Sequence, residues 1–98
     1  MIAPQDCQNM ADIRAEIDAL DRQIITQLGQ RFEYVKAAAS LKTSAKDVQA
    51  QERFDAMLQQ RRHWAEAEGL DADVIEKMYR DLVTYFIKAE LKHWRSDF

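Results

Sequence analysis

The apolar residues in the first half of the chain recur with the period of an α-helix. They follow one another at spacings of three, four or seven and therefore share one helical face: Ile13, Ile17, Leu20, Ile24, Leu28, Val35 and Ala38. Asn9, with Asp12 three residues later, has the side chains expected of an N-terminal cap. No proline interrupts the pattern, which continues toward Lys42. The pattern predicts a first helix of about 33 residues.

Two more helices are predicted after a connecting segment. Residues 42–50, KTSAKDVQA, lose the helical period and are rich in small and polar side chains. The second helix begins near Ala50, and Gly69 is well placed to end it. Asp71 then caps a third helix that continues to the vicinity of Trp94. The apolar sides of these two helices are formed by Phe54, Met57, Leu58, Trp64 and Ala65, and by Val74, Ile75, Met78, Leu82, Phe86 and Leu91.

The length of the first helix predicts an assembly of more than one chain. About 33 residues at about 1.5 Å each form a rod of about 50 Å, whereas a compact chain of about 100 residues has a radius of gyration of about 13 Å. One chain is too small to cover such a rod, and a two-fold homodimer is the commonest way to supply a second chain. The alternative is a hairpin that forms where the helix breaks, for which Gly29 is the candidate hinge.

Composition narrows the class of protein. Two glycines and one proline among 98 residues favour helices, and the length fits a single domain over residues 1–98. The apolar fraction of 47% and the charged fraction of 32% exclude a disordered chain, and no apolar run approaches the roughly 20 residues of a membrane span. The first ten residues have no secretory pattern, and the lone Cys7 supports no disulfide framework. We therefore expect an all-α, cytoplasmic protein, and its net charge of −3 argues against non-specific nucleic-acid binding.

Several common chemistries find little support in the sequence. His63 and His93 have no cysteine or carboxylate at metal-ligand spacing, so no metal site is assigned. There is no glycine-rich phosphate loop, and Cys7 has no neighbouring base. The basic run at residues 61–63 is followed closely by two glutamates and is interpreted as a solvated face.

Three cations lie on or beside the apolar seam of the first helix. Arg31 is seven residues after Ile24, and Lys42 follows eleven residues later, so both should point the same way. Arg14 lies at the edge of the seam. Arg14 and Arg31 are 17 residues apart, which is about 25 Å along a helix and too far for both to grip one small ligand. If both serve one site, Arg14 comes from a partner chain.

A carboxylate interrupts the apolar stripe of the third helix. Steps of four residues give Met78, Leu82, Phe86, Glu90 and Trp94. Charged groups are rarely buried unless they are paired, so two interpretations are open. In one, Glu90 forms a buried salt bridge with Arg31 or Lys42. In the other, the surplus of cations near Glu90 binds an anionic small molecule.

Several segments resemble the all-helical chorismate mutase superfamily over nearly the whole chain. They are DIRAEIDALD with Arg14, LGQRFEYVKAAASLK with Arg31 and Lys42, and QERFDAML with Glu52. Within the superfamily, the chain is most similar to isochorismate pyruvate lyases, which make salicylate for siderophores. The matches that indicate this group are Asp6-Cys7, Trp64-Ala65-Glu66, Gly69-Leu70-Asp71 and Trp94.

The resemblance implies a fold, a reaction and a set of site residues. The fold would be an intertwined homodimer of three-helix chains with two sites, each of which takes Arg14 from the partner chain. Arg14 and Arg31 would bind the two carboxylates of isochorismate, and Lys42 and Glu90 would act at its ether oxygen. A pericyclic hydrogen transfer would then give salicylate and pyruvate, and no cofactor would be required.

Two positions depart from the family pattern. Mutases commonly have an arginine directly before Glu52, where this chain has Gln51, and this departure favours the lyase over a chorismate mutase that makes prephenate. The lyase and many mutases have glutamine at the position of Glu90. A glutamate donates a hydrogen bond only when it is protonated, so we expect Glu90 to work as a protonated donor.

Two alternatives to the lyase stay open. One is a chorismate mutase. The other is a non-enzymatic helical dimerisation module, in which the charges of the seam only fix the register of the helices. Thermal stabilisation by salicylate and pyruvate would distinguish a ligand site from a register device.

Overall fold

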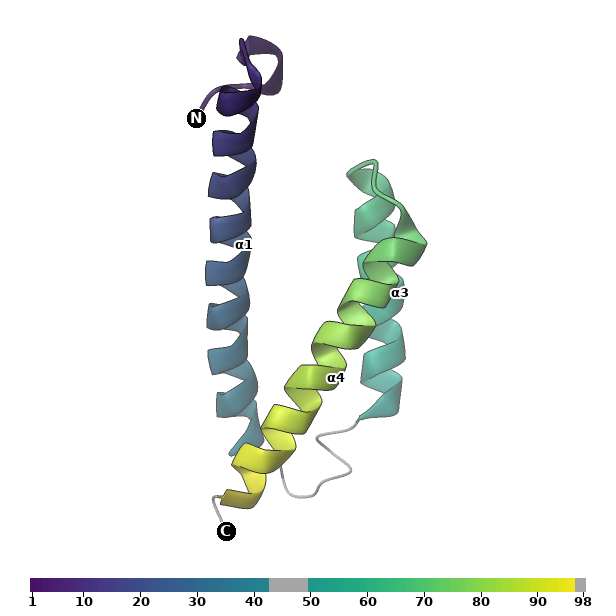
Figure 1. The fold of residues 1–98 in the computed structure, drawn as a ribbon. Coiled ribbons are helices and arrows are strands. Elements are labelled where there is room, and N and C mark those ends of the chain that lie inside the picture. Colours follow the sequence, from purple (N-terminus) through teal and green to yellow (C-terminus); the bar gives the residue numbers. More distant parts are fainter. Residues whose placement is uncertain (43–49, 97–98) are drawn as a thin grey trace. The chain divides into compact units, whose positions relative to one another are not determined.

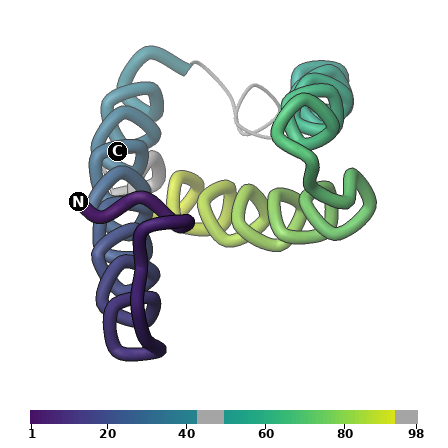
Figure 2. The backbone as a smooth tube through the Cα atoms, turned by 90° about the horizontal axis from the view of Figure 1, so that it is seen from above, coloured from purple at the N-terminus to yellow at the C-terminus, as the bar shows by residue number. Residues whose placement is uncertain are grey.

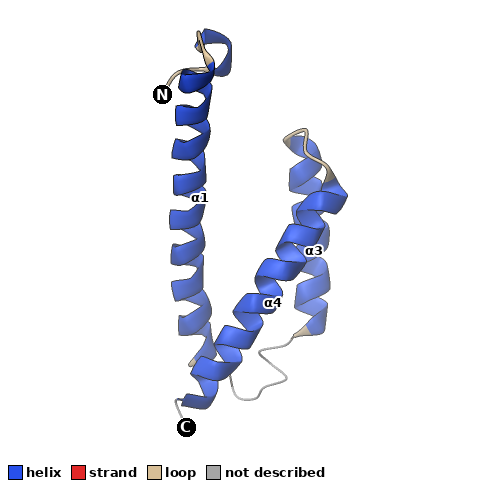
Figure 3. Ribbon diagram, viewed as in Figure 1, coloured by secondary structure: helices blue, strands red, loops and turns tan. Residues whose placement is uncertain are grey.

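The computed structural model describes residues 1–42 and 50–96, with side chains described up to Lys92. The elements are a short 3₁₀ helix, η1 (Pro4–Asp6), and three α-helices: α1 (Met10–Ala39), α3 (Gln51–Ala67) and α4 (Ala72–Ser96). Every element of the described ranges is therefore helical, which confirms the predicted all-α class (Figures 1 and 3). Residues 43–49, most of the predicted connection, lie outside the described residues.

Helix α1 begins at its predicted cap. The side chain of Asn9 accepts a hydrogen bond of 2.8 Å from the backbone N–H of Asp12, and the carboxylate of Asp12 accepts one of 3.1 Å from the N–H of Gln8. These bonds satisfy backbone donors that have no partner within the helix. The helix is continuous through Gly29, so the alternative of a hairpin that breaks there is wrong.

The C-terminal end of α1 differs from the prediction. The helix ends at Ala39, three residues before Lys42, whose backbone N–H instead bonds to the carbonyl of Ala39 at 3.3 Å. The hydroxyl of Ser40 donates a 2.8 Å hydrogen bond to the carbonyl of Ala37. Serine side chains compete in this way with the helical hydrogen bonds, and the last turn tightens. Lys42 therefore does not continue the helical face of Arg31.

The chain forms two units, Met1–Tyr34 and Val35–Phe98, and the boundary between them falls within α1. In the first unit, the apolar stripe of α1 is exposed: Ile13, Ile17, Leu20 and Ile24 each keep between 37% and 52% of their surface accessible. Exposed rows of large apolar residues are typical of surfaces that bind another element or chain. The homodimer stays a prediction, as does the single domain over residues 1–98.

In the second unit, α3 and α4 pack against each other and are joined by a short turn (Figure 2). Gly69 has a positive φ of 75°, and the N–H of Leu70 bonds to the carbonyl of Ala65 at 2.8 Å. This is the glycine-based helix end predicted from the sequence. The carboxylate of Asp71 then accepts hydrogen bonds from the N–H groups of Asp73 and Val74, which confirms the predicted cap of α4.

The core of the second unit is small. Its buried apolar residues come from all three helices: Ala39, Met57, Leu58, Ala65 and Phe86. Three residues of the predicted apolar sides, Trp64, Val74 and Met78, are instead more than half exposed. Two helices and the end of a third cannot cover every apolar face of one another, so these side chains add to the apolar surface of the single chain.

An ionic network joins α3 to α4. The guanidinium of Arg62 lies 2.8 Å from the carboxylate of Asp73 and 3.3 Å from that of Glu76, and Glu76 also accepts a 3.1 Å bond from Arg80. We call these four residues the α3–α4 clamp. The hydrogen bond to Asp73 raises the pKa of Arg62. The ion pair with Asp73 is an exposed one, so it is compatible with the predicted solvated face, but the partners of Arg62 lie on α4 rather than among the glutamates that follow it.

Arg61 departs from the predicted solvated face, because its Nε atom is buried. Its guanidinium lies over the ring of Trp64, 4.6 Å from the centroid, and 5.7 Å from that of Tyr79 on α4. Such cation–π contacts shield the guanidinium and connect the two helices. The spacing of three residues between Arg61 and Trp64 is the sequence signal that could have predicted the first contact.

Glu76 should be the residue on which the clamp depends, because it contacts both Arg62 and Arg80. The Glu76→Gln variant removes this charge, and we expect its free energy of unfolding to fall by about 1 kcal/mol in urea denaturation. Asp81→Asn is the matched control, because Asp81 pairs with Lys77 on the exposed surface of the same helix at 3.6 Å. Its effect should stay within about 0.5 kcal/mol. Equal losses in both variants would contradict a specific role for the clamp.

Candidate functional site

Glu90 lies in the interior of the second unit. It retains 5% of its surface accessibility and follows Phe86 by one helical turn on the buried face of α4. Among the residues whose side chains are described, it is the only buried charged one. The period of four residues therefore predicted its burial correctly. A carboxylate in such a place requires a cation or a proton.

The cation is supplied by Lys42. Its ammonium nitrogen lies 2.8 Å from Oε1 of Glu90, and 27% of the lysine side chain is exposed. The contact is close but not aligned as a hydrogen bond, so Oε1 is buried without a hydrogen-bond donor among the described residues. The attraction is therefore mainly between the two charges, which leaves the hydrogen-bonding capacity of Oε1 unused.

Local structure explains how Lys42 reaches α4. Ala39, the last residue of α1, is completely buried, and its small side chain permits close packing. The tightened turn after Ala39 carries the chain to Lys42 through consecutive hydrogen bonds at residues 40, 41 and 42. Glu90 and Phe86, one turn apart on α4, are both buried. Two residues 48 positions apart in the sequence thus meet because both elements belong to one packed unit.

The two predicted arginines both belong to the first unit. Arg14 is exposed, whereas Arg31 is half-buried. Because α1 is continuous between them, they lie about 25 Å apart along the helix, and one small ligand cannot contact both within a single chain. Lys42 and Glu90 are the predicted site residues that the structure brings together. The participation of Arg14 and Arg31 in the same site stays a prediction.

The first turn of α3 contains the position that departs from the mutase pattern. The side-chain amide of Gln51 donates a 2.9 Å hydrogen bond to the carboxylate of Asp55, one turn further along the helix. Both residues are exposed, and so is Glu52. Gln51 therefore has a local partner on its own helix.

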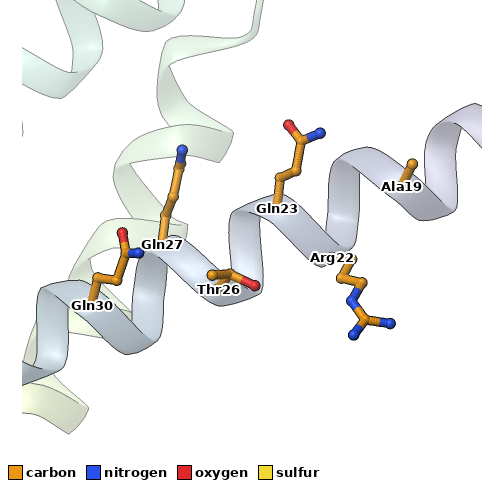
Figure 4. A pocket seen from close by; sticks show the side chains of 6 residues that line it. All are labelled: Ala19, Arg22, Gln23, Thr26, Gln27 and Gln30. Carbon is orange, nitrogen blue, oxygen red and sulfur yellow. The ribbon is translucent and has the colours of Figure 1, made fainter. Parts of the chain in front are cut away.

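A polar hollow lies along α1 but is a poor candidate for a binding site (Figure 4). Its lining comes from one helix alone: Ala19, Arg22, Gln23, Thr26, Gln27 and Gln30. Figure 4 shows Gln23 and Gln27 on the opposite side of the helix from Arg22, so these side chains do not converge on a common point. Binding sites for small molecules are concave and surround most of the ligand.

Comparison with known proteins places these residues in a family context. The sequence model of the family described as chorismate mutase type II matches residues 13–91, a range that contains Arg14, Arg31, Lys42 and Glu90. The chain is 43% identical over 96 residues to the isochorismate pyruvate lyase of Pseudomonas aeruginosa, a match that covers 98% of this chain and 95% of that protein. It is also 42% identical over 72 residues to the T-protein of Haemophilus influenzae, which covers 72% of this chain but only 19% of that longer protein.

The ion pair predicts a specific pattern of stability. Lys42→Met removes the cation and leaves the carboxylate of Glu90 buried, so the free energy of unfolding at neutral pH should fall by about 2 kcal/mol. In the double variant Lys42→Met/Glu90→Gln neither charge remains, and stability should return to within about 1 kcal/mol of the wild type. Urea denaturation of the wild type, Lys42→Met, Glu90→Gln and the double variant measures these changes in the free energy of unfolding. If Lys42→Met is as stable as the wild type, the ion pair does not contribute to the fold.

Proposed function

The chain belongs to the chorismate mutase type II family, and from this premise we propose that it is an isochorismate pyruvate lyase. It would convert isochorismate to salicylate and pyruvate, and the salicylate would serve siderophore biosynthesis in the cytoplasm. The observation that carries the proposal is the 43% identity to the Pseudomonas aeruginosa lyase over nearly the full length of both chains. No helix within residues 1–42 and 50–96 is long and apolar enough to cross a bilayer.

The proposed reaction needs positioning rather than a reactive protein group. A hydrogen atom moves from the ring to the methylene carbon of the enolpyruvyl side chain while the ether bond to the ring breaks. The ring becomes aromatic as salicylate, and the side chain leaves as pyruvate, so atoms and electrons balance within the substrate. The protein would hold the reactive conformer and stabilise the charge that develops on the ether oxygen.

Lys42 is the residue best suited to the ether oxygen. Its ammonium group is partly exposed and is held against α4 by Glu90. A cation in this position would donate a hydrogen bond to the ether oxygen as negative charge develops there. One such donor lowers the activation barrier by about 3 kcal/mol. Glu90 would contact the same oxygen as a protonated carboxylic acid, since the ionised form has no hydrogen to donate.

Arg31 and the partner's Arg14 would bind the two carboxylates of isochorismate. The guanidinium group forms paired hydrogen bonds with carboxylates, which fixes both the position and the orientation of the substrate. The distance between Arg14 and Arg31 along α1 requires two chains for one such site. The exposed apolar stripe of α1 supports this arrangement, because an obligate homodimer would bury it.

A chorismate mutase is the second candidate, favoured by the description of the matching family. It would rearrange chorismate to prephenate with the same four residues. The hydrogen bond between Gln51 and Asp55 argues against it. A neutral side chain that bonds to its own helix is a weak substitute for the arginine that mutases commonly carry at this position.

Incubation with each substrate tests the proposal. The purified protein should release salicylate and pyruvate in equal amounts from isochorismate, and form prephenate from chorismate much more slowly. Liquid chromatography identifies salicylate and prephenate, and a coupled assay quantifies pyruvate. Prephenate as the faster product would establish the mutase instead. A protein inactive on both substrates would favour the helical dimerisation module.

If each active site is formed by two chains, two inactive variants should regain activity when they form mixed dimers. Arg14→Ala and Arg31→Ala should each be nearly inactive as homodimers. After the two variants are unfolded and refolded together, about half the dimers are mixed and each mixed dimer has one intact site, so the rate should reach about a quarter of the wild type. The matched control is Arg14→Ala refolded alone. Mixed dimers without activity would mean that Arg14 does not act across the interface.

A further inference from the structure

The contact between Lys42 and Glu90 joins two groups that would each contact the substrate in the proposed reaction. The ammonium of Lys42 lies 2.8 Å from a carboxylate oxygen of its own chain. A substrate or product with a carboxylate, or with an oxygen that gains negative charge, requires the same ammonium group. The side chain of Glu90 is 6% exposed, so the anion beside Lys42 is a buried group of the protein and not an ion bound from the solvent.

The contact between Lys42 and Oε1 of Glu90 is an ion pair without an aligned hydrogen bond. Oε1 receives no aligned hydrogen bond among the described residues. An anionic ligand that accepts an aligned hydrogen bond from Lys42 would therefore interact with it more strongly than Glu90 does. Transfer of Lys42 to the ligand, however, leaves a buried carboxylate without its cation, and this state is unfavourable unless Glu90 takes up a proton. The binding of any anion to Lys42 is therefore weakened by the cost of leaving the carboxylate of Glu90 without its cation.

We propose that Glu90 is an internal competitor that weakens the binding of anionic ligands to Lys42. The inference rests on the proposed function only for the identity of the ligands, which are salicylate and other carboxylates. In this role Glu90 returns to Lys42 when a product anion leaves, and so favours product release. A neutral side chain at position 90 would bind product more tightly.

Salicylate binding to five proteins tests the competition by isothermal titration calorimetry. They are the wild type, Glu90→Gln, Glu90→Leu, Lys42→Met and Lys42→Met/Glu90→Gln. We expect Glu90→Gln to lower the dissociation constant at least about fivefold. Glu90→Leu should also lower it, because leucine removes the competing anion without supplying a hydrogen-bond donor. In the Lys42→Met background, Glu90→Gln should change the constant by less than about twofold, since the contested cation is gone.

Two controls separate competition from other effects. Glu66→Gln changes the net charge by the same amount at an exposed position of α3 and should leave salicylate binding unchanged. Circular dichroism and thermal unfolding establish that each variant is folded.

The proposal is overturned if Glu90→Gln binds salicylate no more tightly than the wild type, or if Glu90→Leu does not share the increase. It is equally overturned if the increase persists without Lys42, or if no variant binds salicylate. Turnover of isochorismate by the wild type is a separate result. An inactive protein that shows the expected binding pattern would overturn the lyase and leave the competition intact.

Discussion

A carboxylate buried beside apolar side chains must be neutralised, and this requirement organises the part of the chain that carries the candidate site. Glu90 satisfies it through Lys42, at 2.8 Å, and the pair ties the segment after α1 to the buried face of α4. Two buried residues close to the pair in the sequence belong to the small core of the same unit: Ala39, which ends α1, and Phe86, one turn before Glu90. An ion pair of this kind contributes less to stability than its closeness suggests, because desolvation opposes the attraction between the charges.

The same two groups connect stability with chemistry. A lysine held by a buried glutamate is fixed in position, which suits a cation that must act on one oxygen of a substrate. The glutamate also competes for that lysine, and it donates a hydrogen bond only after it has gained a proton. Glu90 consequently has opposing effects in the proposed lyase, because its ionised form holds Lys42 and its protonated form serves the substrate. A glutamine at this position would perform only the second of these tasks.

Local signals in the sequence predicted the features that depend on neighbouring residues. Asn9, Gly69 and Asp71 act as the helix termini expected of them, because capping involves hydrogen bonds within a few residues. The burial of Glu90 followed from the period of α4, and the family was recognised from short segments across the chain. One missed feature is local: the periodicity of α1 gave no sign that the Ser40 side chain would help to end the helix. The other missed features depend on distant partners, because those of Arg62 are 11 and 14 residues away on another helix. The choice between Arg31 and Lys42 as the partner of Glu90 likewise required the packing of the second unit.

The rate of isochorismate turnover, measured for the wild type, Glu90→Gln and Glu90→Leu at one pH, tests most directly whether Glu90 works inside the catalytic site. We expect Glu90→Gln to equal or exceed the wild-type rate, since an amide always has a hydrogen to donate to the ether oxygen. Glu90→Leu should lose most of the activity, because leucine has no donor. Equal rates for the two variants would show that Glu90 serves only as the ionised partner of Lys42.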